Sequence, residues 1–213
     1  MKKPLLVWCC LFLLASYLPL WAQAAPQKNF KGMKGFVFEF DNFELDEFKG
    51  GIGFKKWCSH TMAGIISLDW SWDTDRHENT DNDEYNKYSN FAIGLSGSLE
   101  KHYPLFHKCS PYFGGELSVG YHTSKQVNAS LVEQELKKAE AWDKDFFIEP
   151  SITFGVEYFF TDNISLAGHY ALGAFYSSGK SHQEWGETPQ EWQGKQFGFS
   201  TWSSGLILCF YLN

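Results

Sequence analysis

The chain ends on the stretch "SSGLILCFYLN", residues 203–213, and its alternation decides the fold. In a strand, successive side chains lie on opposite faces. One face here is large and apolar: Leu206, Leu208, Phe210 and Leu212. The other face is mixed: Gly205, Ile207, Cys209 and Tyr211. No polar tail follows, although the last residues of a soluble domain are usually frayed and solvated. The segment therefore predicts a strand that faces lipid.

The first 24 residues have the layout of a secretory signal peptide. Lys2 and Lys3 precede an apolar run over residues 5–20, and the small residues of "AQA", ending at Ala24, form a cleavage site. We expect cleavage there and a single domain over residues 25–213. An uncleaved membrane helix is the alternative, but the apolar run is short for a span.

Composition narrows the class of protein. The formal net charge is −7 and no basic cluster is present, which argues against nucleic-acid binding. Aromatic residues make up 18% of the chain and are accompanied by 19 glycines, a combination typical of closed β-architectures. No apolar run after Ala25 is long enough for a transmembrane helix. The pattern thus favours a β-protein.

Eight segments alternate with period two, and an even number is typical of outer-membrane barrels. These predicted strands are residues 33–42, 48–57, 62–73, 88–101, 111–123, 146–160, 164–176 and 197–213.

The connections between these segments alternate in length. One end has tight turns at 58–61 and 161–163 and an intermediate one at 105–110. Long polar loops are expected at the other end over 74–87, 124–145 and 177–196. Short turns on one side and long loops on the other are the layout of a barrel with the periplasm below and the exterior above.

The two faces of the predicted strands differ in kind. One face is bulky and apolar, whereas the other carries small residues and charges of both signs. The expected inward charges are Glu39, Lys49, Lys55, Asp69, Glu100, Glu116, Glu149 and Glu157. Eight strands enclose an interior just wide enough for side chains. We therefore predict an all-β fold, an eight-stranded antiparallel up-and-down transmembrane β-barrel with a filled lumen.

Aromatic residues near both strand ends predict two girdles at the depth of the lipid headgroups. The predicted loop-end girdle is Trp70, Trp72, Tyr121 and Tyr176. The predicted turn-end girdle is Trp57, Tyr158, Phe160 and Phe210.

Three stretches carry a resemblance to a known group: "GGIGFKKWCSHTMAGIISLDW" (50–70), "SPYFGGELSVGY" (110–121) and the C-terminal strand. The mature chain resembles the small eight-stranded outer-membrane β-barrels of Gram-negative bacteria, of the OmpX and OmpA transmembrane-domain type. The resemblance implies location in the cell outer membrane, with outer-membrane lipid and the barrel-insertion machinery as partners. A monomer is expected, with a surface partner that the sequence does not identify.

The C-terminal strand also looks like the signal that the insertion machinery recognises. In that signal a polar residue is followed by glycine and then by apolar and aromatic residues. Ser203, Gly205, Leu208 and Phe210 fit this pattern, although Tyr211 and the two residues after it extend beyond the aromatic at which the family signal usually stops.

Members of this group differ in role, so the resemblance implies location more firmly than activity. We expect a structural or surface-interaction role through the outer loops. The alternatives are a small pore and a lipid A-modifying hydrolase. A hydrolase could use His122 and Ser124 with Glu133 or Glu135, because an imidazole can activate a hydroxyl. Alternation puts this pair on the lumen side, away from lipid, so no enzyme is expected.

Two polar segments and one histidine are candidate sites. The acidic stretch 73–84 lacks the glycine of a calcium loop, so a solvated loop is expected rather than a metal site. Residues 132–142 have Glu and Lys at helical spacing and predict a short helix over the barrel mouth. His169 is expected to hydrogen-bond inside the lumen. No cofactor is expected.

The mature chain keeps three cysteines, Cys58, Cys109 and Cys209, and alternation places Cys209 in the lumen wall. Cys58 and Cys109 both fall at the turn end, in a compartment that permits disulfides. A disulfide needs the two Cα atoms within about 7 Å. The sequence therefore leaves two alternatives, a Cys58–Cys109 disulfide or free thiols.

Overall fold

The structure, a computed structural model, describes residues 30–42, 47–79, 84–103, 108–132, 135–185 and 188–212. They form eight strands. The strands are β1 (Lys34–Asn42), β2 (Glu47–Trp57), β3 (Met62–Asn79), β4 (Glu84–His102), β5 (Cys109–Val132), β6 (Glu135–Phe159), β7 (Ile164–Trp185) and β8 (Thr188–Leu212).

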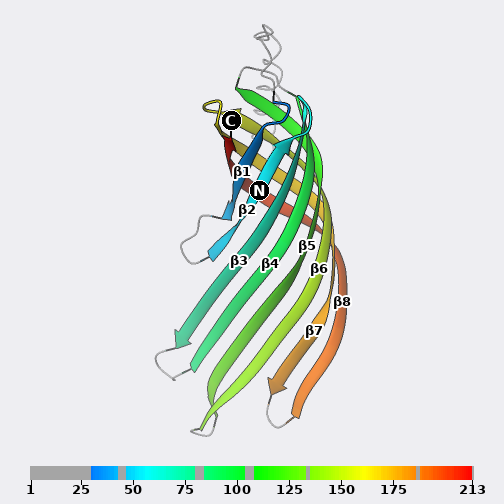
Figure 1. The fold of residues 1–213 in the computed structure, drawn as a ribbon. Helices are drawn as coiled ribbons and strands as arrows, with labels where there is room; N and C mark the ends of the chain where they lie inside the picture. Colours follow the sequence, from blue (N-terminus) through cyan, green and yellow to red (C-terminus); the bar gives the residue numbers. More distant parts are fainter. Residues whose placement is uncertain are drawn as a thin grey trace, which may run out of the picture.

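The eight strands close into a barrel (Figure 1). Each strand pairs antiparallel with the next, and β1 pairs with β8 between Lys34↔Leu212 and Phe40↔Leu206. The C-terminal strand therefore closes the ring, and the predicted all-β, antiparallel, up-and-down arrangement is confirmed. None of the described residues forms a helix long and apolar enough to cross a membrane.

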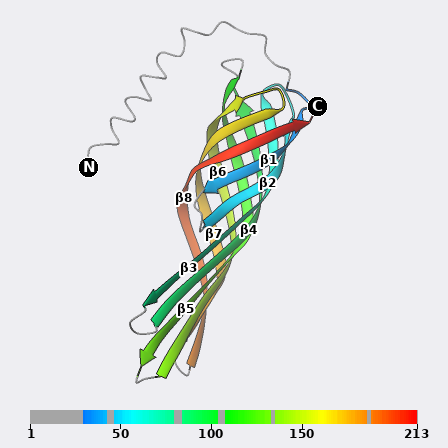
Figure 2. The same ribbon diagram turned by 90° about the vertical axis from the view of Figure 1, so that its left-hand side faces the viewer.

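Six strands continue well beyond the ends of β1 and β2 (Figures 1 and 2). The β5–β6 ladder runs from Cys109↔Tyr158 to Val132↔Glu135 without a break. The predicted long loops and the helix over 132–142 are therefore wrong. The hairpins keep their backbone hydrogen bonds beyond the closed ring, since antiparallel strands can pair with a face exposed to water. We call the part of β3–β8 beyond the closed ring the extension.

The exposed large apolar side chains of the ring point outward, as predicted. Ile66 is 65% exposed and Leu99 is 61% exposed, whereas Lys55 and Glu157 are fully buried inside. One irregularity lies in the β7–β8 ladder between His169 and Ala171, where β8 carries one extra residue. This bulge reverses the parity of β8, so Phe197 and Phe199 also face outward.

Three interior glycines each lie directly opposite an aromatic residue on the neighbouring strand. The pairs are Tyr112↔Gly155, Gly120↔Phe147 and Phe175↔Gly198. The aromatic ring covers the glycine in each pair, since an added Cβ would lie within 2.7 Å of ring atoms. Large rings thus fit a narrow interior because the position opposite has no side chain.

Gly155→Ala should lower the free energy of unfolding by about 1–3 kcal/mol, the usual cost of overpacking. Its Cβ would lie 2.3 Å from the Gly168 carbonyl oxygen, where the backbone has no room to move. Gly97→Ala is the matched control, because nothing lies within 4 Å of an added Cβ there. Urea titrations of both variants in detergent micelles check this; equal stabilities would contradict the close approach.

Candidate functional site: the barrel interior

A buried ion network fills the interior near the turn end. Lys55 Nζ lies 2.9 Å from Glu100 Oε2 and 3.0 Å from Glu157 Oε2. All three side chains are almost entirely removed from solvent. The same ammonium is 5.5 Å from the centroid of the Trp57 ring and 5.9 Å from that of Tyr112. One lysine therefore links β2 to carboxylates on β4 and β6, across the barrel.

Hydroxyl and imidazole groups form further hydrogen bonds with the two carboxylates. Ser165 Oγ donates to Glu157 Oε1 at 2.5 Å, and Tyr211 donates its hydroxyl hydrogen to the same oxygen at 2.7 Å. His102 hydrogen-bonds Glu100 through Nε2 at 3.1 Å and Ser110 through Nδ1 at 3.2 Å. Buried charges are tolerated when they are paired and hydrogen-bonded in this way.

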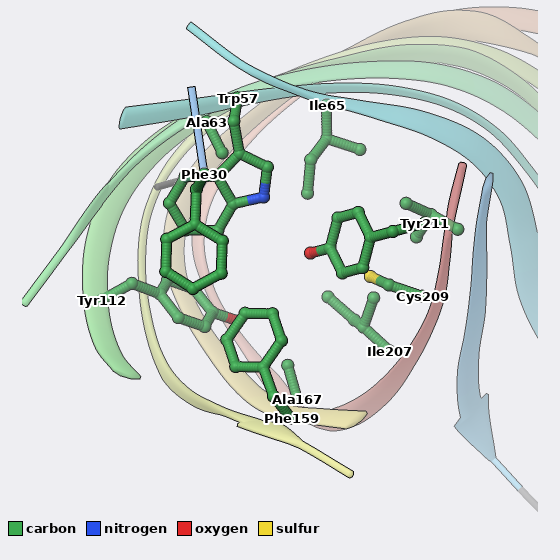
Figure 3. Close-up of a cluster of buried hydrophobic side chains, with 11 residues drawn as sticks. Phe30, Trp57, Ala63, Ile65, Tyr112, Phe159, Ala167, Ile207, Cys209 and Tyr211 are labelled. Atoms are coloured by element: carbon green, nitrogen blue, oxygen red, sulfur yellow. The ribbon is translucent and has the colours of Figure 1, made fainter. Parts of the chain in front are cut away.

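A cluster of buried hydrophobic and aromatic side chains fills the interior at the turn end (Figure 3). Phe30, from the turn before β1, stacks on Trp57 at 4.5 Å and on Phe159 at 5.0 Å. Gly32 turns the chain at φ 88°, a conformation that favours glycine, and its N–H donates to the Trp57 carbonyl at 2.9 Å. We call Phe30, Trp57 and Phe159 the aromatic plug.

A cavity of about 550 Å³ occupies the interior on the loop side of the network. Its lining includes charged side chains of both signs, and Phe147 and Phe175 are among its walls. The charged and imidazole residues that line it are Glu39, Lys49, Asp69, Glu116, Glu149, His122 and His169. The cavity and the buried network confirm the predicted inward direction of these side chains.

His122 and Ser124 do not form a nucleophile pair with each other. His122 Nε2 hydrogen-bonds Asn90 Oδ1, and Ser124 Oγ donates to Asp143 Oδ2 at 3.3 Å. Glu133 lies outside the described residues, and the side chain of Glu135 is not described. The acidic stretch 73–84 belongs largely to β3, and no group of His, Cys, Asp and Glu in the described ranges could hold a metal ion.

The predicted girdle residues divide into two sets. Outward-facing and exposed are Trp72, Tyr121, Tyr158, Phe160, Tyr176 and Phe210, and Trp70 is half-buried. The assignment of Trp57 to a girdle is wrong: it is 1% exposed and belongs to the aromatic plug. The reason is its parity, because Trp57 lies two residues after Lys55 and therefore faces inward with it.

The disulfide between Cys58 and Cys109 is not formed, and all three described cysteines are free thiols. Cys58 follows β2, whereas Cys109 begins β5, and β3 and β4 lie between them. Three strand spacings of about 4.8 Å separate the two along the wall, well beyond the reach of a disulfide. Cys209 is buried in the lumen wall, as predicted.

The C-terminal residues occupy both faces of β8. Gly205 is buried toward the interior, whereas Leu208 and Phe210 lie on the outer face, and the side chain of Ser203 is not described. Their recognition by the insertion machinery stays a prediction.

Two residues that complete the interior were not predicted: Phe30 and His102. His102 is on the inward parity of β4, so alternation could have identified it. The pattern predicts Tyr211 on the same face as Cys209, but not its hydrogen bond to Glu157. Phe30 lies outside every strand and gave no periodic signal.

Comparisons with known proteins add little to this description. No protein-family model matches the chain, and no curated protein does. Among solved structures, it is similar to the N-terminal β-barrel domain of Pseudomonas aeruginosa OprF, with 14% identity and a TM-score of 0.28. That match covers 87% of this chain and 100% of the OprF domain. The barrel itself rests on the strand pairing described above.

Proposed function

We propose that this chain is an outer-membrane β-barrel protein with a sealed interior, whose extension serves a surface interaction. The observation that carries the proposal is the inversion of polarity: bulky apolar side chains are exposed around the ring, while an ion network is buried inside it. Water would penalise such an outer face, whereas lipid favours it. The signal peptide predicted over residues 1–24 agrees with export.

The height of the apolar band suits a bilayer. Phe146 and Tyr158 mark its ends on β6, twelve residues apart. At about 3.3 Å per residue and a tilt of ~45°, this stretch rises roughly 28 Å along the barrel axis. The hydrocarbon core of a bilayer is of about that thickness. The extension then lies outside the membrane.

A sealed interior predicts that the purified protein gives no porin-sized conductance in planar bilayers. The aromatic plug and the ion network both fill the lumen on the turn side of the cavity. An eight-stranded barrel has no room for water beside such a filling. Steady, large conductance steps from pure protein, with an empty detergent blank as the control, would contradict a sealed lumen.

The extension offers unpaired strand edges for an interaction. In the described chain, β1 reaches β8 only over Leu206–Leu212, and β2 reaches β3 only as far as Asp73. The remainder of β8 and the end of β3 pair on one side alone. Free backbone N–H and C=O groups at such edges can add a strand from another protein.

Deleting residues 124–145 tests the interaction role. Tyr121 and Phe146 are paired in register, so the deletion leaves a two-residue turn on an otherwise intact barrel. Full-length and shortened proteins, each displayed on intact cells, are used to capture labelled surface proteins. We expect capture by the full chain only. Equal capture by two folded proteins would contradict a role for the β5–β6 hairpin of the extension and would leave the free edges of β3 and β8 as the binding sites.

The proposal includes no catalytic role. His122 and Ser124 bind Asn90 and Asp143 inside the barrel, on the face away from lipid. Neither the hydrolase nor the pore alternative is favoured by a specific contact in the interior.

A further inference from the structure

Lysines border the apolar band of the outer face at both ends. On β4 to β8, the first exposed charged residue beyond the band on the extension side is a lysine, although the chain has 25 acidic and only 18 basic residues. The upper lysine ring, on the extension side, is Lys87, Lys125, Lys144, Lys180 and Lys195. The lower lysine ring, on the turn side, is Lys34, Lys56 and Lys101.

The position of the upper ring follows from the strand registers. Lys144 lies two residues beyond Phe146, and Lys195 lies two residues beyond Phe197. Lys180 lies four residues beyond Tyr176 on the same parity of β7. All of these side chains therefore leave the outer face just above the aromatic residues, at the depth where lipid headgroups carry their phosphates.

Three of these lysines form a compact cationic patch over β6, β7 and β8. Lys144 lies directly opposite Lys180, and Lys180 is diagonal to Lys195, which pairs with Ser178. Like charges placed directly opposite each other destabilise a sheet. In the described chain, no carboxylate forms an ion pair with any of the three. An external anion between them would remove the repulsion.

We propose that Lys144, Lys180 and Lys195 bind the phosphate groups of the glycolipid in the outer leaflet. The inference rests on the proposed membrane orientation. Opposite and diagonal positions on a sheet are about 5 and 7–8 Å apart, so phosphates can bridge neighbouring ammonium groups. Trp142 extends the patch, since Lys144 Nζ lies 4.6 Å from its ring centroid.

A diphosphorylated glycolipid fits this patch better than a phospholipid with one phosphate. Three lysines on adjacent strands form one patch, whereas in the lower ring only Lys34 and Lys56 lie opposite each other and Lys101 is two strands away. Two phosphates on one headgroup can engage all three upper lysines at once, which raises affinity over a single contact.

The test compares two triple variants that remove equal charge. K144Q/K180Q/K195Q changes the upper patch, and K34Q/K56Q/K101Q is the matched control. Each protein is folded in detergent, checked for the mobility of folded protein on unboiled gels, and titrated with diphosphorylated lipid A, dephosphorylated lipid A or phosphatidylglycerol. Binding is measured by tryptophan fluorescence.

We expect diphosphorylated lipid A to bind the upper variant about a hundredfold more weakly than wild type. Each lysine near an anionic surface contributes roughly a fivefold increase in affinity, and three are removed. The control variant should stay within about threefold of wild type. Dephosphorylated lipid A should bind weakly to all three proteins.

Three outcomes overturn the inference: equal loss in both variants, equal binding of both lipid A forms, or phosphatidylglycerol binding wild type as tightly as diphosphorylated lipid A does. A wild-type protein that never acquires folded mobility would instead contradict the proposed membrane barrel. The two failures are thereby distinguished.

Discussion

Lys55→Met should lower the free energy of unfolding by about 3–5 kcal/mol, the largest effect we expect from a single substitution. The change removes the ammonium group that contacts Glu100 and Glu157 at 2.9 and 3.0 Å. Both carboxylates would stay buried without their counter-charge. Urea titration of the protein in detergent micelles measures the loss.

Two further variants separate charge from packing at Lys55. The triple variant K55M/E100Q/E157Q should recover much of the lost stability, because it leaves no unpaired charge. Lys56→Met, one residue along on the exposed outer face, should change stability by less than about 0.5 kcal/mol. If Lys55→Met were no worse than Lys56→Met, the buried network would not stabilise the barrel.

Trp57→Ala should cost about 3–5 kcal/mol, the usual range for removing a large buried aromatic side chain. Trp57 is 1% exposed and stacks between Phe30 and His102, at 4.5 and 4.4 Å. Its loss would leave a cavity beside the ion network and remove the main contact that holds Phe30 in place.

Trp72→Ala is the matched control for Trp57. Trp72 is 49% exposed on the outer face, so its truncation leaves no internal cavity and should cost well under half as much. Urea titrations followed by the remaining tryptophans check both variants. Equal losses would place Trp57 in the outer girdle after all.

The eight strands could be predicted from the sequence because period-two alternation is a local signal. Lys55 and Glu157 each sit among small inward residues and bulky outward ones, which marked them as interior before any pairing was known. The strand ends could not be predicted in the same way. Beyond Ser124, Val127, Ala129 and Leu131 still alternate with polar residues, but Lys125 interrupts the apolar face. The Glu and Lys spacing over 132–142 indicates a helix, although the ladder continues through Val132↔Glu135.

The contacts between interior side chains could not be predicted from alternation, because they depend on strand registers and on a turn outside the strands. Tyr211 on β8 reaches Glu157 on β6 through the registers of β6, β7 and β8, which place the two strands two positions apart in the ring. Phe30 precedes β1 and becomes part of the plug through a turn at Gly32. Trp57 differs from these residues, because its parity with Lys55 in the sequence already indicates an inward side chain.

Heat modifiability in lipid tests most directly whether this closed ring spans a membrane. The purified protein is mixed with lipid vesicles, and unboiled and boiled samples are run on the same denaturing gel. A closed barrel in lipid satisfies its backbone hydrogen bonds internally and resists detergent until it is boiled. We predict two distinct mobilities, with the unboiled form bound to the vesicles. A single mobility, with the protein left in the soluble fraction, would contradict a membrane-spanning barrel.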